Sequence, residues 1–140
     1  MPIFSRNRRL GVQSCLVNLI NGHCPDLNLN QWIGNRRDES RVPLSIAILV
    51  VPVEDGRPQV EDHFPTVTRE FSTTGVSIIL DRPRPLDKVI LVFRLESELV
   101  HLQGQARHLS PMGAGFHYLG IELHETVHPG DLPELNRLIL

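Results

Sequence analysis

The arrangement of apolar and polar residues changes in character near residue 42. Downstream of that point, six short segments are either continuously apolar or alternate between apolar and polar positions, and both patterns are typical of β-strands. These segments cover residues 44–51, 59–71, 76–80, 89–93, 99–109 and 116–123. Pro65 in the second segment predicts an edge position or a bulge, because proline cannot donate a ladder hydrogen bond. Six short strands with no helix between them predict a mostly β fold, either an antiparallel barrel or a sandwich.

The two ends of the chain carry a helical pattern instead. Apolar residues recur at helical spacing near the start (Leu10, Leu16, Val17, Leu19 and Ile20) and near the end (Leu132, Leu135, Leu138 and Ile139). Glycine and asparagine interrupt the first set, so we expect only a short helix there. The second set predicts a short amphipathic C-terminal helix packed on the sheet. We therefore expect a partly helical leader over residues 1–34 and a β domain over residues 35–140.

The charge balance limits the classes of ligand that the chain can bind. The chain has 140 residues, of which 41% are hydrophobic, so it can form one domain with a substantial core. Its formal net charge of -2 argues against a protein that binds nucleic-acid polymers or a membrane surface through a large basic excess. Residues 1–41 nevertheless contain six arginines and three acidic residues, whereas residues 42–140 contain eight basic and thirteen acidic residues. Any anion site must therefore be local and must lie near the upstream arginines.

Cysteine content and hydropathy predict where the protein works. Cys15 and Cys24 are the only two cysteines, and arginines interrupt the first residues where a signal peptide would need an apolar run. We interpret both cysteines as small core residues and expect a reducing, cytoplasmic setting. No window reaches the ~18 consecutive apolar residues of a membrane span, so no membrane insertion is expected.

Two short polar stretches are the candidate functional motifs. Arg37 and Arg41 lie four residues apart in the polar segment 35–41, directly before the first long apolar run, and Arg36 adds a third guanidinium. The second motif runs from Glu70 to Gly75, between two predicted strands. In purely structural terms this second motif is a tight turn, in which Gly75 supplies a positive φ and the serine at position 72 bonds its own backbone.

Taken together, the two motifs resemble those of the PilZ family, the bacterial receptors for cyclic di-GMP. The family pattern is Arg-x-x-x-Arg, a strand pair, and then Asp/Asn-x-Ser-x-x-Gly. Arg37 and Arg41 match the first motif, and Ser72 and Gly75 match the second, while Glu70 stands where Asp or Asn is usual. The resemblance covers about residues 35–140 and implies a six-stranded antiparallel PilZ-like β-barrel with a helical tail.

The resemblance also implies a ligand and a role for each motif residue. Cyclic di-GMP carries two phosphodiesters and two guanines, and a guanidinium can pair with the O6 and N7 edge of guanine or stack on its face. Arg37 and Arg41 would do both, and Arg36 would clasp a phosphate. Glu70 would accept hydrogen bonds from guanine N1 and N2, and the turn at Ser72 and Gly75 would offer a hydroxyl and backbone groups.

These features predict a receptor that is not an enzyme and that needs no cofactor beyond its ligand. Such a protein passes its signal by contact with a downstream protein, which the sequence does not identify. Two alternatives stay open. One is a degenerate PilZ-like adaptor that keeps the barrel for protein contacts without the nucleotide. The other is a metal-binding barrel enzyme that uses the histidines of the later strands, at positions 101, 108, 117 and 124.

Overall fold

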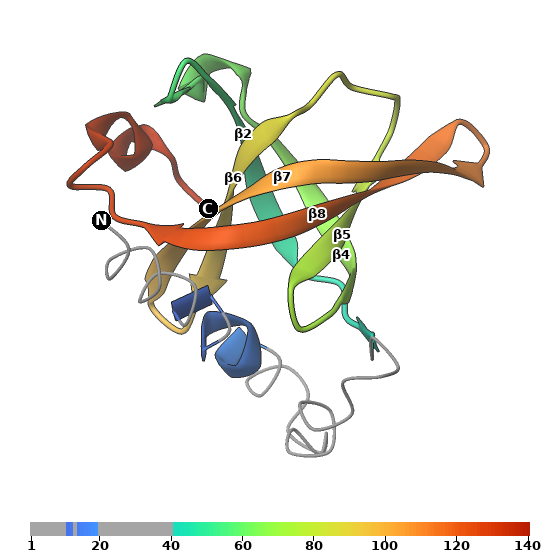
Figure 1. The fold of residues 1–140 in the computed structure, drawn as a ribbon, viewed down its shortest axis with the longest axis horizontal. Helices are drawn as coiled ribbons and strands as arrows, with labels where there is room; N and C mark the ends of the chain where they lie inside the picture. The colour runs from blue at the N-terminus through green and yellow to red at the C-terminus, as the bar shows by residue number, and fades with distance from the viewer. Residues whose placement is uncertain (1–10, 13, 20–40) are drawn as a thin grey trace.

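The computed structural model describes residues 11–12, 14–19 and 41–140 (Figure 1). Residues 11–12 and 14–19 are helical, which confirms a short helix near the start of the chain. The strands are β1 (Val42–Pro43), β2 (Ala47–Glu54), β3 (Arg57–Pro58), β4 (Phe64–Phe71), β5 (Gly75–Leu80), β6 (Lys88–Leu95), β7 (Glu98–Gly113) and β8 (Phe116–Val127). Two 3-10 helices, η2 (Val60–Asp62) and η3 (Pro133–Arg137), complete the described elements. The predicted boundary between residues 34 and 35 lies outside the described residues and stays a prediction.

The six longer strands form a closed antiparallel barrel. Their hydrogen-bonded order is β4-β5-β8-β7-β6-β2, and a further pairing of β2 with β4 closes the ring (Figure 1). Closure removes the unpaired edges that an open sheet would expose. The barrel predicted from the sequence is therefore confirmed, and the two-residue strands β1 and β3 are additions at its rim.

Burial on both faces of β2 and β6 explains their continuous apolar runs. Alternate residues of these strands point into the barrel, and the others point outward into a second cluster. The outer cluster contains Leu49, Val51, Val60, Ile90, Val92, Leu135 and Leu138. It is covered by the C-terminal segment, which the sequence predicts as a helix. The structure has only the five-residue 3-10 helix η3 there, because the backbone is already extended again at Leu138.

The helix near the start of the chain closes one end of the barrel (Figure 1). Val12, Leu16 and Leu19 are at most 4% exposed and belong to the same apolar cluster as the barrel interior. Cys15 packs against that cluster, whereas Cys24 lies outside the described residues. Burial raises the pKa of the Cys15 thiol, which fits a core residue rather than a reactive one. In the part of the chain that the structure describes, no helix has the length and hydropathy needed to span a membrane.

Strand β4 pairs with three other strands along its length. Its first half pairs with β2, and its second half pairs with β1 on one side and with β5 on the other. Pro65 pairs with Leu49 of β2 in the first half, and no β5 residue pairs with it in the described register. That position agrees with the expected edge character of the proline. The bulge lies further along, at Arg69, between Thr68 and Glu70.

The Thr68 side chain forms hydrogen bonds with the backbone of the segment between β1 and β2. Its hydroxyl donates to the Leu44 carbonyl at 2.6 Å and accepts from the Ile46 amide at 2.9 Å. The threonine is fully buried, so both backbone groups would lack a partner without it. Thr68 thus joins the incoming segment to the barrel wall.

Thr68→Val is therefore expected to lower the free energy of unfolding by about 1–3 kcal/mol, the cost of leaving buried polar groups without a partner. Urea unfolding followed by circular dichroism measures this change. Ser45→Ala, at an exposed position of the same break, is the matched control and should be near neutral. A valine variant as stable as its parent would contradict this role for the hydroxyl.

A second buried polar residue, His101, lies in an apolar setting. It pairs with Val92 of β6 and with Val127 of β8, is 5% exposed, and has no partner for Nε2 among the described residues. Burial lowers the pKa of its imidazole below the ordinary value of 6.5. Between that lowered pKa and 6.5, the unfolded chain binds a proton that the folded chain does not bind.

The barrel should therefore lose stability as the pH falls through that window. His101→Leu should make the loss between pH 7.5 and pH 5.5 smaller, and the exposed His108→Gln should leave it unchanged. Thermal melting at both pH values measures the difference. An unchanged pH dependence in the His101 variant would show that other groups control acid stability.

Candidate functional site

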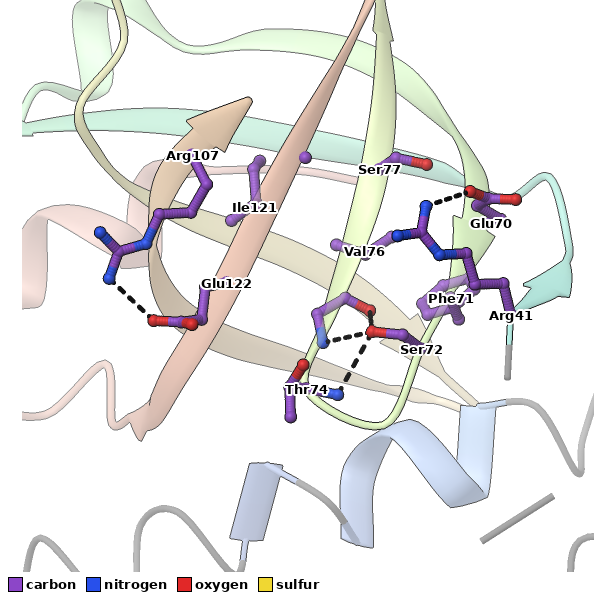
Figure 2. A pocket seen from close by; sticks show the side chains of 12 residues that line it. Arg41, Glu70, Phe71, Ser72, Thr74, Val76, Ser77, Arg107, Ile121 and Glu122 are labelled. Atoms are coloured by element: carbon purple, nitrogen blue, oxygen red, sulfur yellow. Dashed lines mark hydrogen bonds and ion pairs between the residues drawn. The ribbon is translucent and has the colours of Figure 1, made fainter. Parts of the chain in front are cut away.

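A pocket of about 180 Å³ opens on the outside of the barrel, where β4, β5, β8 and β7 run side by side (Figure 2). The polar side chains that line it come from both predicted motifs and from strands β5, β7 and β8. They are Arg41, Glu70, Ser72, Thr74, Ser77, Arg107 and Glu122. The pocket therefore brings together residues that lie up to 81 positions apart in sequence.

The turn from residue 72 to residue 75 forms one rim of the pocket. The Ser72 hydroxyl accepts hydrogen bonds from the amides of Thr74 at 3.3 Å and Gly75 at 3.1 Å, and the Ser72 amide donates to the Gly75 carbonyl at 2.9 Å. The expected bonding of the serine to its own turn is therefore confirmed. These bonds fix the hydroxyl oxygen at the pocket rim.

Gly75 is needed for a reason other than the one expected from the sequence. Its backbone does not have a positive φ. Instead, a Cβ atom at this position would lie 2.2 Å from the Ile121 carbonyl oxygen of β8. The expectation of a left-handed turn residue was wrong, because the constraint is the close approach of two paired strands.

Strand β1 places Arg41 beside the second motif. Val42 pairs with Phe71 and Pro43 pairs with Glu70, so the residue before β1 lies next to the end of β4. The Arg41 guanidinium donates to Glu70 Oε1 at 3.0 Å. Arg41 is 58% exposed along its side chain, so this ion pair is accessible to solvent.

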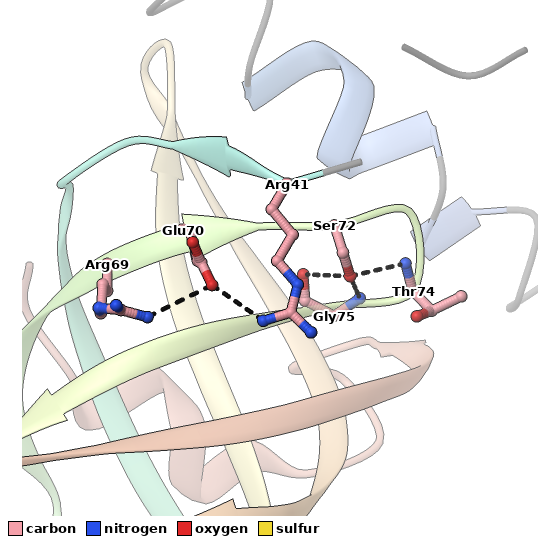
Figure 3. Close-up of polar contacts among 6 residues, drawn as sticks. All are labelled: Arg41, Arg69, Glu70, Ser72, Thr74 and Gly75. Atoms are coloured by element: carbon pink, nitrogen blue, oxygen red, sulfur yellow. Dashed lines mark hydrogen bonds and ion pairs between the residues drawn. The ribbon is translucent and has the colours of Figure 1, made fainter. Parts of the chain in front are cut away.

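The bulge in β4 adds Arg69 to the same cluster (Figure 3). Its Nη1 lies 3.3 Å from Glu70 Oε1, the same oxygen that Arg41 contacts. The guanidinium carbon also lies 4.2 Å from the centre of the Tyr118 ring, in a cation–π contact. One carboxylate oxygen is thus shared by two arginines.

A parallel arrangement lies on the other side of the pocket. Arg107 is at a bulge in β7, and its Nη2 contacts Glu122 Oε1 at 2.9 Å. His124 Nε2 lies 2.7 Å from the same oxygen. The hydrogen bond from His124, followed by that from Arg107, lowers the pKa of the Glu122 carboxyl. Glu122 therefore stays ionised across the neutral range.

Of the motif residues predicted from the sequence, the structure brings together Arg41, Glu70, Ser72 and Gly75 at this pocket. Arg36 and Arg37 lie outside the described residues, so their roles stay predictions. Among the described residues, which include the four histidines of the later strands, no group of three or more His, Cys, Asp or Glu side chains is placed to hold a metal ion.

Comparison with known proteins gives the family. The family model of the PilZ domain matches residues 35–140. The chain belongs to the PilZ family. This is the receptor family that the two sequence motifs resemble, and the match spans all four motif residues that line the pocket.

The PilZ chain also resembles a solved structure, the Bacillus subtilis inhibitor of motility (MotI/DgrA). The TM-score is 0.50 at 16% sequence identity, so the resemblance concerns the fold. It covers 75% of this PilZ chain and 54% of that protein, so this chain matches about half the length of the inhibitor. None of the curated proteins matches the PilZ chain.

Gly75→Ala should destabilise the PilZ barrel by about 1–3 kcal/mol, because β5 and β8 must separate to admit the methyl group. Urea unfolding measures the loss. Gly130→Ala is the matched control, since nothing lies within 4 Å of a Cβ built there. Equal stability of the two variants would contradict the steric role assigned to Gly75.

Proposed function

We propose that this PilZ chain is a non-enzymatic, cytoplasmic receptor for cyclic di-GMP and that the pocket beside Arg41 is part of its binding site. The observation that supports this most strongly is that one arginine of the first motif meets Glu70, Ser72 and Gly75 of the second motif at a single pocket. Arg41 reaches this pocket from the β1 side of β4, whereas the second motif forms the end of β4 and the turn into β5. The family relationship supplies the class of ligand.

The size of the pocket indicates how the ligand would be held. At about 180 Å³ it is smaller than the roughly 300–1,000 Å³ of sites for drug-sized ligands. We infer that it takes one part of the dinucleotide, either a guanine or a phosphodiester. Arg36 and Arg37, directly upstream of Arg41, would cover the remainder.

The chemistry of the site fits an anionic ligand with flat bases. A guanidinium offers two parallel donors to a phosphodiester or to the O6 and N7 edge of guanine, and its flat face can stack on a base. The Ser72 turn adds a fixed hydroxyl and backbone groups at the rim. Glu70, the carboxylate expected to accept from guanine, is bound to Arg41 and Arg69 instead.

Binding would change the surface that the chain presents to a partner. Ligand contacts made by residues upstream of β1 would favour one arrangement of that segment over others, and a partner protein can distinguish the two arrangements. The occupied Glu70 carboxylate is the one observation that favours the alternative, an adaptor that does not bind the nucleotide.

Calorimetric titration of the purified chain with cyclic di-GMP separates the receptor from the adaptor. Arg37→Ala and Arg41→Ala should each weaken binding by roughly ten- to a hundredfold, since each removes a charged hydrogen-bond donor. The Arg41 variant should keep the circular dichroism spectrum of the parent, because its exposed ion pair with Glu70 contributes about 1 kcal/mol or less to stability.

Arg82→Ala, in the exposed loop between β5 and β6, is the matched control and should bind as the parent does. A parent chain that gives no heat of binding favours the adaptor. An Arg41 variant that binds as tightly as the parent would refute the role assigned to that arginine.

A further inference from the structure

The shared carboxylate of Glu70 has the position that an anion would take between two arginines. Arg41 and Arg69 approach the same oxygen from opposite sides, at 3.0 Å and 3.3 Å (Figure 3). One carboxylate neutralises only one of the two guanidinium charges, so the cluster keeps a net positive charge. A phosphodiester has two non-bridging oxygens that share one negative charge, and it can take a donor from each arginine.

Arg69 is held in place independently of Glu70. The bulge in β4 brings its side chain to the outer face, and the Tyr118 ring lies against its guanidinium at 4.2 Å. Stacking of this kind limits the conformations of a long side chain, so less entropy is lost when a ligand binds. Arg69 should therefore stay in position if Glu70 moves away.

Ser77 provides an independent sign of a ligand. It pairs directly with Glu70 across β4 and β5, lines the same pocket and is 7% exposed. Its hydroxyl has no hydrogen-bond partner among the described residues (Figure 2). Buried hydroxyl groups usually have a partner, and one that has none next to an anion-binding cluster suits a ligand oxygen.

We propose that Arg41, Arg69 and Ser77 form a phosphodiester subsite and that the Glu70 carboxylate occupies it until the ligand arrives. This inference rests on the proposed function and assigns two residues, Arg69 and Ser77, that lie outside both motifs. On binding, a phosphate oxygen replaces Glu70 Oε1 between the two guanidinium groups, and the Ser77 hydroxyl donates to the phosphate. The displaced Glu70 carboxylate is then free to accept from the N1 and N2 groups of a guanine.

The first test is calorimetric titration with cyclic di-GMP at low and high salt. Arg69→Ala should bind roughly ten- to a hundredfold more weakly than the parent, and the affinity that remains should depend less on salt. Arg82→Ala, an exposed arginine away from the pocket, should match the parent in both respects. Arg69→Ala with unchanged affinity and salt dependence would overturn the subsite.

Ser77→Ala separates a binding role from a structural one. Its hydroxyl has no partner in the described structure, so its removal should leave the melting temperature unchanged or slightly raised. Binding of cyclic di-GMP should nevertheless weaken several-fold. A variant that melts earlier and binds normally would assign Ser77 to the fold and overturn its place in the subsite.

Inorganic pyrophosphate, an anion without a base, tests the subsite apart from the messenger. Glu70→Gln should bind pyrophosphate more tightly than the parent, because the neutral amide leaves both guanidinium groups available. Adding Arg69→Ala to that variant should remove the gain, and a gain that persists would overturn the subsite.

The two probes distinguish failure of the subsite from failure of the proposed function. Pyrophosphate binding that depends on Arg69, without cyclic di-GMP binding, would support the anion subsite and overturn the choice of messenger. Cyclic di-GMP binding that does not depend on Arg69 would support the choice of messenger and overturn the anion subsite. A chain and a Glu70→Gln variant that bind neither probe would overturn both.

Discussion

The pairing of β4 with three other strands is the constraint on which the candidate site depends. β4 pairs with β2 to close the barrel. Its end carries the start of the second motif, which leads into β5, and pairs with β1 as well as with β5. The segment that contains β1 and β2 pairs with β4 twice, once through each strand. The register of this pairing changes between β1 and β2. The buried Thr68 hydroxyl satisfies the backbone groups that this change leaves unpaired. Without that break, Arg41 would not lie beside Glu70.

Two β-bulges then determine which side chains reach the outer face. In an unbroken strand, Arg69 would point inward if Glu70 pointed outward, because the side-chain period is two. The extra residue at the β4 bulge lets both reach the surface, while Phe71 and Thr68 stay buried. Arg107 occupies the corresponding bulge in β7. Bulges are common next to binding sites for this reason, since they redirect a side chain without breaking the sheet.

The sequence predicts the barrel and the positions of the motifs, but not the whole pocket. Continuous and alternating apolar runs identify the six long strands, because a strand buried on both faces is apolar throughout and a strand buried on one face alternates. The pattern does not reveal that Arg69 and Arg107 reach the outer face, because a bulge changes the face of a residue without changing its polarity. The reason for the glycine at position 75 could not be read from the sequence, since the close approach of the Ile121 carbonyl depends on a strand 46 positions away. The C-terminal helix is shorter than the sequence predicts, because the same apolar spacing also suits the 3-10 helix η3 and the extended tail that cover β2 and β6.

The acidic balance of the whole chain has a consequence for how an anionic ligand can be selected. With a formal net charge of -2, the protein does not attract a dianion from a distance, so its affinity must come from short-range contacts. At the pocket, each carboxylate is shared by two basic groups, Glu70 by Arg41 and Arg69, and Glu122 by Arg107 and His124. These carboxylates hold the donors in position and also compete with any ligand for them. A simple anion must therefore overcome that competition with its charge alone, whereas a dinucleotide can add base stacking and hydrogen bonds to the guanine edge. A site built in this way favours the ligand that satisfies the most groups over the ligand that merely carries the most charge.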